Sequence, residues 1–281
     1  PAGFTNGSLI LWQFRQLGGT PQELSLTGNA EVLVGGALFG GDLSITSPGI
    51  QISRTRFNGK THLHKTGATG AASPGGNYFA DSTEIINSGV QGMTLGTTLP
   101  DSFMAPTRLI NLSQTEMFVA YQGAGHYFGS DLFMSTSAGG YLYLSPYTSS
   151  PTNVMGNIVV ESHGPGLLNF GGAATPGSTV VLAQGRTISV GNGGFNTGVL
   201  GLAGFQQMGA TPQLFFLTGS SVLKFGSRSI FGGDVTSESP GLYFNGTRFN
   251  GKGSFKKTGA GNDFGIGGNY FADSVTMVNN G

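Results

Sequence analysis

The chain has 281 residues, with 13 basic and 13 acidic side chains, so its formal net charge is zero. A neutral chain lacks the electrostatic attraction that draws proteins to nucleic acid and to anionic membrane surfaces, and we expect neither as a partner. The absence of cysteine excludes disulfides, thiolate metal sites and thiol nucleophiles. No apolar run approaches the ~18 residues of a membrane span, so membrane insertion is not expected either.

The N-terminal part of the chain, from Ser8 onward, consists of short apolar runs separated by Gly, Asn, Ser and Pro. Strict alternation of apolar and polar residues over 42–46 and 49–53 predicts half-buried strands. Glycine accounts for 51 residues without a Gly-X-Y period, which indicates many turns and excludes collagen. Because no stretch has a helical stripe of useful length, we expect an all-β fold.

A finer rhythm is set by an aromatic residue that precedes an alternating strand. It recurs at Phe39, Phe57, Phe79, Phe103 and Phe128, with a degenerate version at Met155-Gly156-Asn157 and further copies at Phe231, Phe249 and Phe271. The first four steps are 18, 22, 24 and 25 residues, which is the length of one coil of a β-solenoid.

Each aromatic strand is followed by a Gly-led second strand, as in GIQIS, GMTLG, GYLYLS, GLLNFG and GLYFNG. Two or three strands per coil, joined by Gly and Asn corners that take positive φ, would stack along one axis. We therefore predict a parallel β-helix, right-handed as parallel crossovers are, with about a dozen coils of ~18–27 residues and an internal Phe column. At ~4.8 Å per coil the rod would be ~55–60 Å long.

A larger repeat encloses this rhythm, because the stretch 56–88 returns as 248–280, an offset of 192 residues. We divide the chain into a first full unit, 1–191, and the first half of the next unit, 192–281, continuous with it. The region from Gly172 to Gly194 breaks the Phe rhythm and is interpreted as the seam between the units. Both termini are interpreted as cuts inside a longer array.

Several phrases of the first unit resemble the tandem units of giant, repeat-built surface proteins of gliding and biofilm-forming bacteria. They are Phe57-Asn58-Gly59-Lys60, Lys65-Thr66-Gly67-Ala68, Gly75-Gly76-Asn77-Tyr78-Phe79, Ile85-Ile86-Asn87-Ser88-Gly89 and 185–191. Phe79-Ala80-Asp81 departs from the F-N-G of that pattern. The resemblance implies secretion and a role as an extracellular fibre or adhesin stalk, and it supplies no catalytic residue.

One loop of the second unit, 259–268, resembles a calcium-binding nonapeptide turn, with Asn262 and Asp263 as its candidate ligands. Such a site needs two adjacent turns of the same kind, and the first copy has Gly70 and Ala71 at these places. A plain loop is the better interpretation, and we predict no metal and no cofactor.

Three further patterns have a structural alternative that we favour. His62 and His64 have a metal-ligand spacing, but their counterparts are Ser254 and Lys256, so a solvated strand face is preferred. Gly59-Lys60-Thr61 resembles the end of a phosphate-binding loop without the helix that such a loop requires, and is interpreted as a turn before a strand. The recurring lysines are interpreted as a solubilising face: Lys60, Lys65, Lys252, Lys256 and Lys257.

We expect a structural segment of a long secreted bacterial fibre or stalk, without catalytic residues. Its expected partner is itself, by covalent continuation or by end-to-end or lateral association, with surface glycans as a further candidate. The alternative is a carbohydrate-binding or polysaccharide-cleaving β-helix. The scattered positions of the 13 acidic residues argue against an enzyme of this kind.

Overall fold

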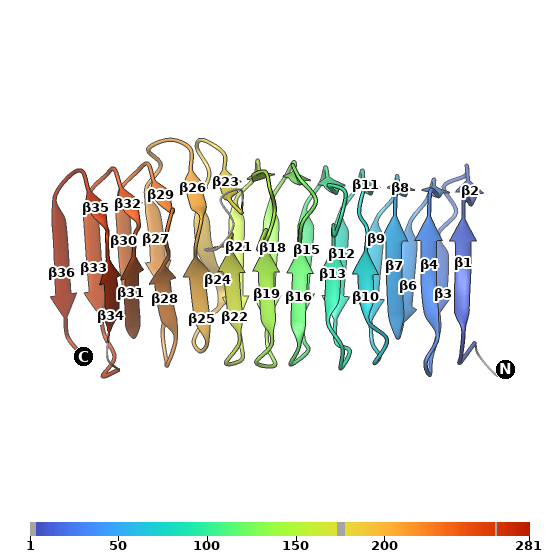
Figure 1. Ribbon diagram of the computed structural model, residues 1–281, viewed down its shortest axis with the longest axis horizontal. Helices are drawn as coiled ribbons and strands as arrows, with labels where there is room; N and C mark the ends of the chain where they lie inside the picture. Colours follow the sequence, from blue (N-terminus) through green and yellow to red (C-terminus); the bar gives the residue numbers. More distant parts are fainter. Residues whose placement is uncertain (1–3, 173–177, 262) are drawn as a thin grey trace.

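The computed structural model describes residues 4–172, 178–261 and 263–281, and within them the chain is a parallel β-solenoid of about 12 turns without a helix. Each turn contributes three strands, and strands three places apart along the chain pair in parallel. The pairing is interrupted between β7 (Gly49–Ser53) and β10 (Ala71–Ser73) and between β24 (Ile188–Phe195) and β27 (Gln213–Phe216). The result is an elongated stack of coils in which the N-terminal coil and the C-terminal coil lie at opposite ends (Figure 1).

The strands form three long faces, which we name after their first strands. The β1 face contains β1 (Ser8–Trp12), β4 (Glu31–Gly35), β7 (Gly49–Ser53), β10 (Ala71–Ser73), β13 (Met93–Leu95), β16 (Glu116–Val119), β19 (Tyr141–Leu144), β22 (Leu167–Phe170), β25 (Val199–Leu202), β28 (Val222–Phe225), β31 (Gly241–Asn245) and β34 (Phe264–Gly267).

The β2 face is one unbroken sheet of two- and three-residue strands. It contains β2 (Arg15–Gln16), β5 (Leu38–Phe39), β8 (Arg56–Phe57), β11 (Tyr78–Phe79), β14 (Ser102–Phe103), β17 (Tyr127–Phe128), β20 (Thr152–Val154), β23 (Val180–Leu182), β26 (Phe205–Gln207), β29 (Ile230–Phe231), β32 (Arg248–Phe249) and β35 (Tyr270–Phe271).

The β3 face is divided into a sheet of eight strands and a sheet of four. It contains β3 (Gln22–Ser25), β6 (Leu43–Ser47), β9 (Thr61–Lys65), β12 (Thr83–Asn87), β15 (Thr107–Asn111), β18 (Leu132–Thr136), β21 (Ile158–Ser162) and β24 (Ile188–Phe195), followed by β27 (Gln213–Phe216), β30 (Val235–Ser239), β33 (Gly253–Lys257) and β36 (Val275–Asn279).

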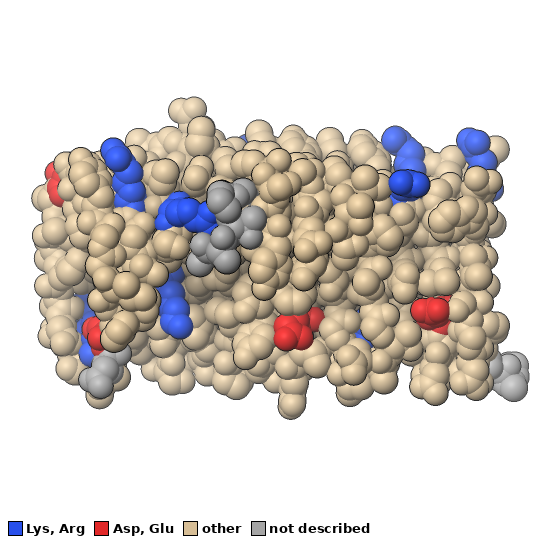
Figure 2. Space-filling view, in the orientation of Figure 1, with Lys and Arg blue, Asp and Glu red and all other residues tan. Residues whose placement is uncertain are grey.

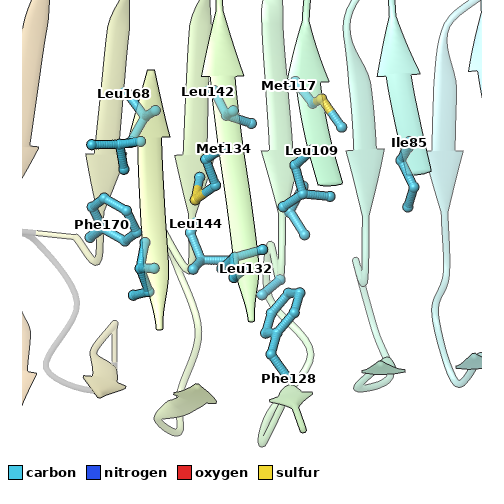
Figure 3. Close-up of a cluster of buried hydrophobic side chains, with 14 of the residues drawn as sticks. Ile85, Leu109, Met117, Phe128, Leu132, Met134, Leu142, Leu144, Leu168 and Phe170 are labelled. Carbon is cyan, nitrogen blue, oxygen red and sulfur yellow. The ribbon is translucent and has the colours of Figure 1, made fainter. Parts of the chain in front are cut away.

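The core lies between the three faces and follows from the alternation in the sequence. Along β12, β15 and β18 every second side chain is buried, so alternate residues point into the core and the intervening ones point outward. Leucine, isoleucine, methionine and phenylalanine side chains from the β1 and β3 faces meet in the interior (Figure 3). This burial is what the predicted strand pattern requires.

The predicted internal Phe column is confirmed. Phe57 is fully buried, and its ring stacks on those of Phe39 and Phe79 at centroid distances of 5.7 and 4.7 Å. The degenerate position was predicted one residue too late: Met155 is exposed, and Val154 continues the column in register with Phe128. A smaller side chain therefore occupies the same inward place.

The corner that follows the β1 face has a left-handed backbone conformation. Glycine was expected at this corner, but several coils have another residue there. Gly36 has φ +60°, and in other coils the corner is made by Arg54 at +49°, Ala120 at +55° and Ser145 at +61°. No described asparagine has a positive φ, so the predicted Asn corners are wrong. Hydrogen bonding between successive coils holds these residues in a conformation that non-glycine residues rarely adopt.

The interpretation of the recurring lysines as a solubilising face is wrong for two of them. Lys65 is fully buried at the end of β9, and its Nζ donates to the carbonyl oxygens of Gly67 and Gln91, both at 2.8 Å. Its counterpart Lys257 is 6% exposed. The alternation places Lys65 inward, where the flanking rungs have the buried polar residues Ser47 and Asn87.

One surface contact is the same in both copies of the repeat. The Arg56 guanidinium lies over the Tyr78 ring at 4.4 Å, and Arg248 lies over Tyr270 at 4.6 Å. At the predicted seam, β23 pairs with β20 and β26, so the solenoid continues through it; residues 173–177 lie outside the described part of the chain. The β3 face alone changes sheet there, between β24 and β27.

Candidate functional site

A trough of about 560 Å³ lies on the β3 face. It extends over six neighbouring strands of this face: β3, β6, β9, β12, β15 and β18. It lies near the first residues of these strands, where the chain arrives from the β2 face. Five inter-strand steps of about 4.8 Å give it a length of about 24 Å. A hollow of this length suits a chain-like ligand rather than a single small molecule.

One wall of the trough is a row of outward side chains from successive strands, which we call the charged row. Register places these residues side by side: Glu23, Ser44, His62, Glu84, Arg108 and Phe133. Each belongs to the first outward position of its strand, because the alternation that buries the neighbouring residues turns these outward.

Glu84 is the centre of the charged row. Its Oε2 lies 3.0 Å from His62 Nδ1, and its Oε1 lies 3.5 Å from Arg108 Nε. The carboxylate is thus held between two nitrogen-bearing side chains, while about a third of its side chain remains exposed. This geometry fixes the orientation of the carboxylate and leaves part of it accessible from the trough.

The opposite wall is formed by the tight turns that lead into the strands. Lys60 donates its backbone N–H to Asp42 Oδ1 at 2.8 Å, which fixes one turn against the next. A Cβ on Gly59 would lie 2.4 Å from the backbone carbon of Gly41, so only glycine permits this close stacking. Gly59-Lys60-Thr61 is therefore a turn that leads directly into β9, and the described residues place no helix after it.

The far end of the trough is aromatic. The guanidinium carbon of Arg108 lies 5.6 Å from the centroid of the Phe133 ring, so the cation partly covers an apolar surface. Donors, acceptors and one aromatic ring therefore line a single trough. Such a set can bind hydroxyl groups and an apolar ring face together.

The two histidines on β9 point outward, but each binds a different neighbour. His62 contacts Glu84, whereas His64 Nε2 lies 2.8 Å from Ser88 Oγ. Burial, with a smaller contribution from His62, lowers the pKa of His64. Across the described residues, no group of three or more His, Cys, Asp or Glu side chains is placed to hold a metal ion.

Of the two candidate calcium ligands, the structure describes Asp263. Asn262 lies outside the described residues. Asp263 accepts a hydrogen bond from the backbone N–H of Leu242 at 3.0 Å and lies 3.6 Å from Lys257 Nζ. Its carboxylate thus has a hydrogen-bonding role between coils and an ion-pair partner.

A second surface feature is an aromatic patch on the β1 face, formed by Phe118, Tyr121, Tyr141, Tyr143 and Tyr147. The Phe118 and Tyr143 rings are stacked at 5.2 Å, and Tyr141 and Tyr147 are well exposed. Figure 2 shows a long face of the molecule on which charged side chains are few and scattered. The patch provides apolar contact area with few ionic groups.

A buried polar chain links successive coils beneath the surface. Asp101 Oδ1 accepts from both the backbone N–H and the side-chain amide of Asn77, and the Asp101 N–H donates to His126 Nδ1 at 3.0 Å. Burial raises the pKa of Asp101 to about 6 and lowers that of His126 to about 4. Both groups are enclosed, so they belong to the fold rather than to a binding surface.

Sequence reasoning missed Glu84, Arg108 and Phe133 as partners of His62, although a signal was present. These residues lie five positions after Phe79, Phe103 and Phe128, as His62 lies five after Phe57. Aligning the coils on their Phe residues would have brought the charged row together.

Comparison with known proteins found no matching family model, no matching curated protein and no matching solved structure. Within the described residues, no helix is long and apolar enough to cross a membrane.

Proposed function

We propose that this chain is a rigid, non-catalytic segment of a secreted bacterial surface fibre or adhesin stalk. The observation that supports it is the unbroken sheet of the β2 face, whose 12 strands run through both copies of the repeat. A continuous hydrogen-bonded ladder does not hinge between units as linked globular domains do. A chain built this way provides reach and stiffness.

Covalent continuation of the solenoid is the proposed mode of assembly, with end-to-end stacking as the other route. In the first unit Ile85 is fully buried and pairs in register with Leu109 of the next coil. Successive coils that pair in this way bury apolar side chains between them, and coils of the same kind added by either route would extend the same contact.

The length added per unit tests the proposal. One unit corresponds to eight steps along the β2 face, from β2 to β26, or about 38 Å at about 4.8 Å per step. Chains with one, two and three copies of residues 1–191 should form straight rods that lengthen by this amount, measured by small-angle scattering and electron microscopy. Compact particles, or rods that bend freely at each junction, would contradict the proposal.

The proposed location is tested on the source cells. Antibodies against this segment should label filaments on intact, unpermeabilised cells by immunogold electron microscopy. Labelling only after permeabilisation would contradict an extracellular role, whatever the stiffness of the isolated rod.

A further inference from the structure

We propose that the trough on the β3 face binds a neutral polysaccharide chain, lying along the solenoid axis. This adds a recognition function to the proposed stalk and does not depend on it, because a rod of any role could bind a glycan here. Three features of the charged row support this role: the fold does not depend on it, it combines acidic, basic and aromatic side chains, and it lies in the middle of a sheet.

The solenoid does not need the charged row in order to fold. In the second unit Ser254 and Thr276 replace His62 and Glu84, and they pair in the same register on β33 and β36. The turn beside them is retained, since Lys252 donates its N–H to Asp234 Oδ1 at 2.8 Å. The frame is therefore common to both units, whereas the charged chemistry belongs to the first.

Stability gives little reason for these charges. The side chains of His62, Glu84 and Arg108 are 37%, 35% and 54% exposed. Exposed ion pairs contribute little to the free energy of folding. A cluster that the fold neither requires nor gains much from, placed in a hollow of about 560 Å³, is better explained by a ligand.

The chemistry of the trough favours a neutral polyhydroxylated chain. Three carboxylates, two basic side chains and a histidine line it: Glu23, Asp42, Glu84, Lys60, Arg108 and His62. A sugar hydroxyl both donates and accepts hydrogen bonds, so it fits alternating carboxylates and cations. A polyanion would meet the carboxylates and a polycation the basic groups, and like charges in close contact are unfavourable.

The position of the trough disfavours an extended peptide. Peptides that pair with a sheet do so at an exposed edge, where main-chain groups are unpaired. The strands under the charged row, β9, β12 and β15, are each paired on both sides. A ligand here must therefore be recognised by side chains, and Phe133 offers an apolar ring at one end for a sugar face.

Binding should be measured by calorimetry and by ligand-observed NMR on the whole chain. The probes are hexasaccharides of β-1,4-glucan, β-1,4-mannan, β-1,4-xylan and α-1,4-glucan, with polygalacturonate and hexalysine as charged probes. At least one neutral hexasaccharide should bind saturably, and Glu84→Gln and Arg108→Met should each weaken it at least 10-fold. Far-UV circular dichroism should show both variants folded.

Matched controls separate this trough from other surfaces. Thr276→Val and Lys252→Met, at the equivalent places of the second unit, and Tyr141→Ala, in the aromatic patch, should leave affinity unchanged. The proposal is overturned if no neutral probe binds, if a charged probe is preferred, or if Tyr141→Ala abolishes binding while Glu84→Gln does not. None of these results would alter the rod length that tests the stalk.

Discussion

At the scale of single residues, Lys65 shows how a solenoid can enclose a charged group. The lysine is fully buried, and its ammonium is satisfied by two carbonyl oxygens rather than by a carboxylate. Burial lowers its pKa to about 8 from an unfolded value of 10.5. Hydrogen bonds to Gly67 in its own coil and to Gln91 in the next thus help to keep inside a group that would otherwise be solvated.

We predict that Lys65 makes the protein more stable in mild alkali. Between about pH 8 and 10.5 the unfolded chain holds this proton and the folded chain does not, so the free energy of unfolding rises with pH. Lys65→Met should remove a rise of up to about 3 kcal/mol. Denaturant unfolding at pH 7.5 and 9.5 measures it, with exposed Lys60→Met as control. An equal rise in wild type and Lys65→Met would be contrary to this account.

Asp101 and His126 should have opposite pH dependences. The raised pKa of Asp101, about 6, means that stability from this group falls as the pH rises from about 4 to 6. The lowered pKa of His126, about 4, means that its contribution rises with pH from about 4 to 6.5. The wild-type profile should therefore be nearly flat across this range.

Single substitutions separate the two contributions. Asp101→Asn keeps an acceptor for Asn77 and should leave a profile that rises with pH. His126→Asn keeps an acceptor for the Asp101 N–H and should leave one that falls. Thermal unfolding between pH 4 and 7 gives both slopes, and slopes of the same sign in the two variants would show that these groups do not dominate.

The Phe column could be predicted from the sequence, whereas the buried Lys65 and the partners of Glu84 were not. The Phe spacing predicted the coil and its inward column, because one large side chain per coil is visible in a single sequence. It did not predict that Lys65 lies inside. Lys65 follows Phe57 at the same spacing as Asn87 follows Phe79, and this comparison between coils was not made. The partners of Glu84 come from the coil before it and the coil after it, so they become apparent only after the coils are aligned.

At the scale of the element, the rung on the β2 face is the unit that stabilises the fold. Its strands have only two or three residues, yet each strand from β5 to β17 contributes a Phe ring to a stacked column. Short strands make few hydrogen bonds, and burial of the ring therefore provides much of the stabilisation that holds consecutive coils together. The outward side chains of the β3 face lack this role.

Phe57→Ala should destabilise the protein by about 3–5 kcal/mol, because it leaves a cavity between Phe39 and Phe79. Phe57→Asp should prevent the local coils from forming. The double variant His62→Ala with His64→Ala changes outward residues and should cost less than about 1 kcal/mol. Urea titration followed by far-UV circular dichroism compares them. A larger loss in the histidine variant would mean that the inward and outward faces were assigned the wrong way round.

At the scale of the whole molecule, a solenoid is held together mainly by contacts between neighbouring coils. Each interior coil has a neighbour on both sides, whereas β1 and β36 each pair on one side only. The difference is visible in burial: alternate residues of β15 and β18 are enclosed, while every residue of β36 is exposed. Stability should therefore be graded along the rod rather than uniform.

Hydrogen exchange of this chain should follow that gradient. Amides of β12, β15 and β18 should exchange last, and amides of β1, β34 and β36 first, because opening an end coil breaks one interface and opening a central coil breaks two. Mass spectrometry of peptides after timed exchange measures it. Adding one further unit after residue 281 should raise the protection of β34 and β36 toward that of β10 and β12, their counterparts in the first unit. Unchanged exchange there, or earliest opening near β23 and β24, would place the weakest interface at the junction of the two units and not at the end of the rod.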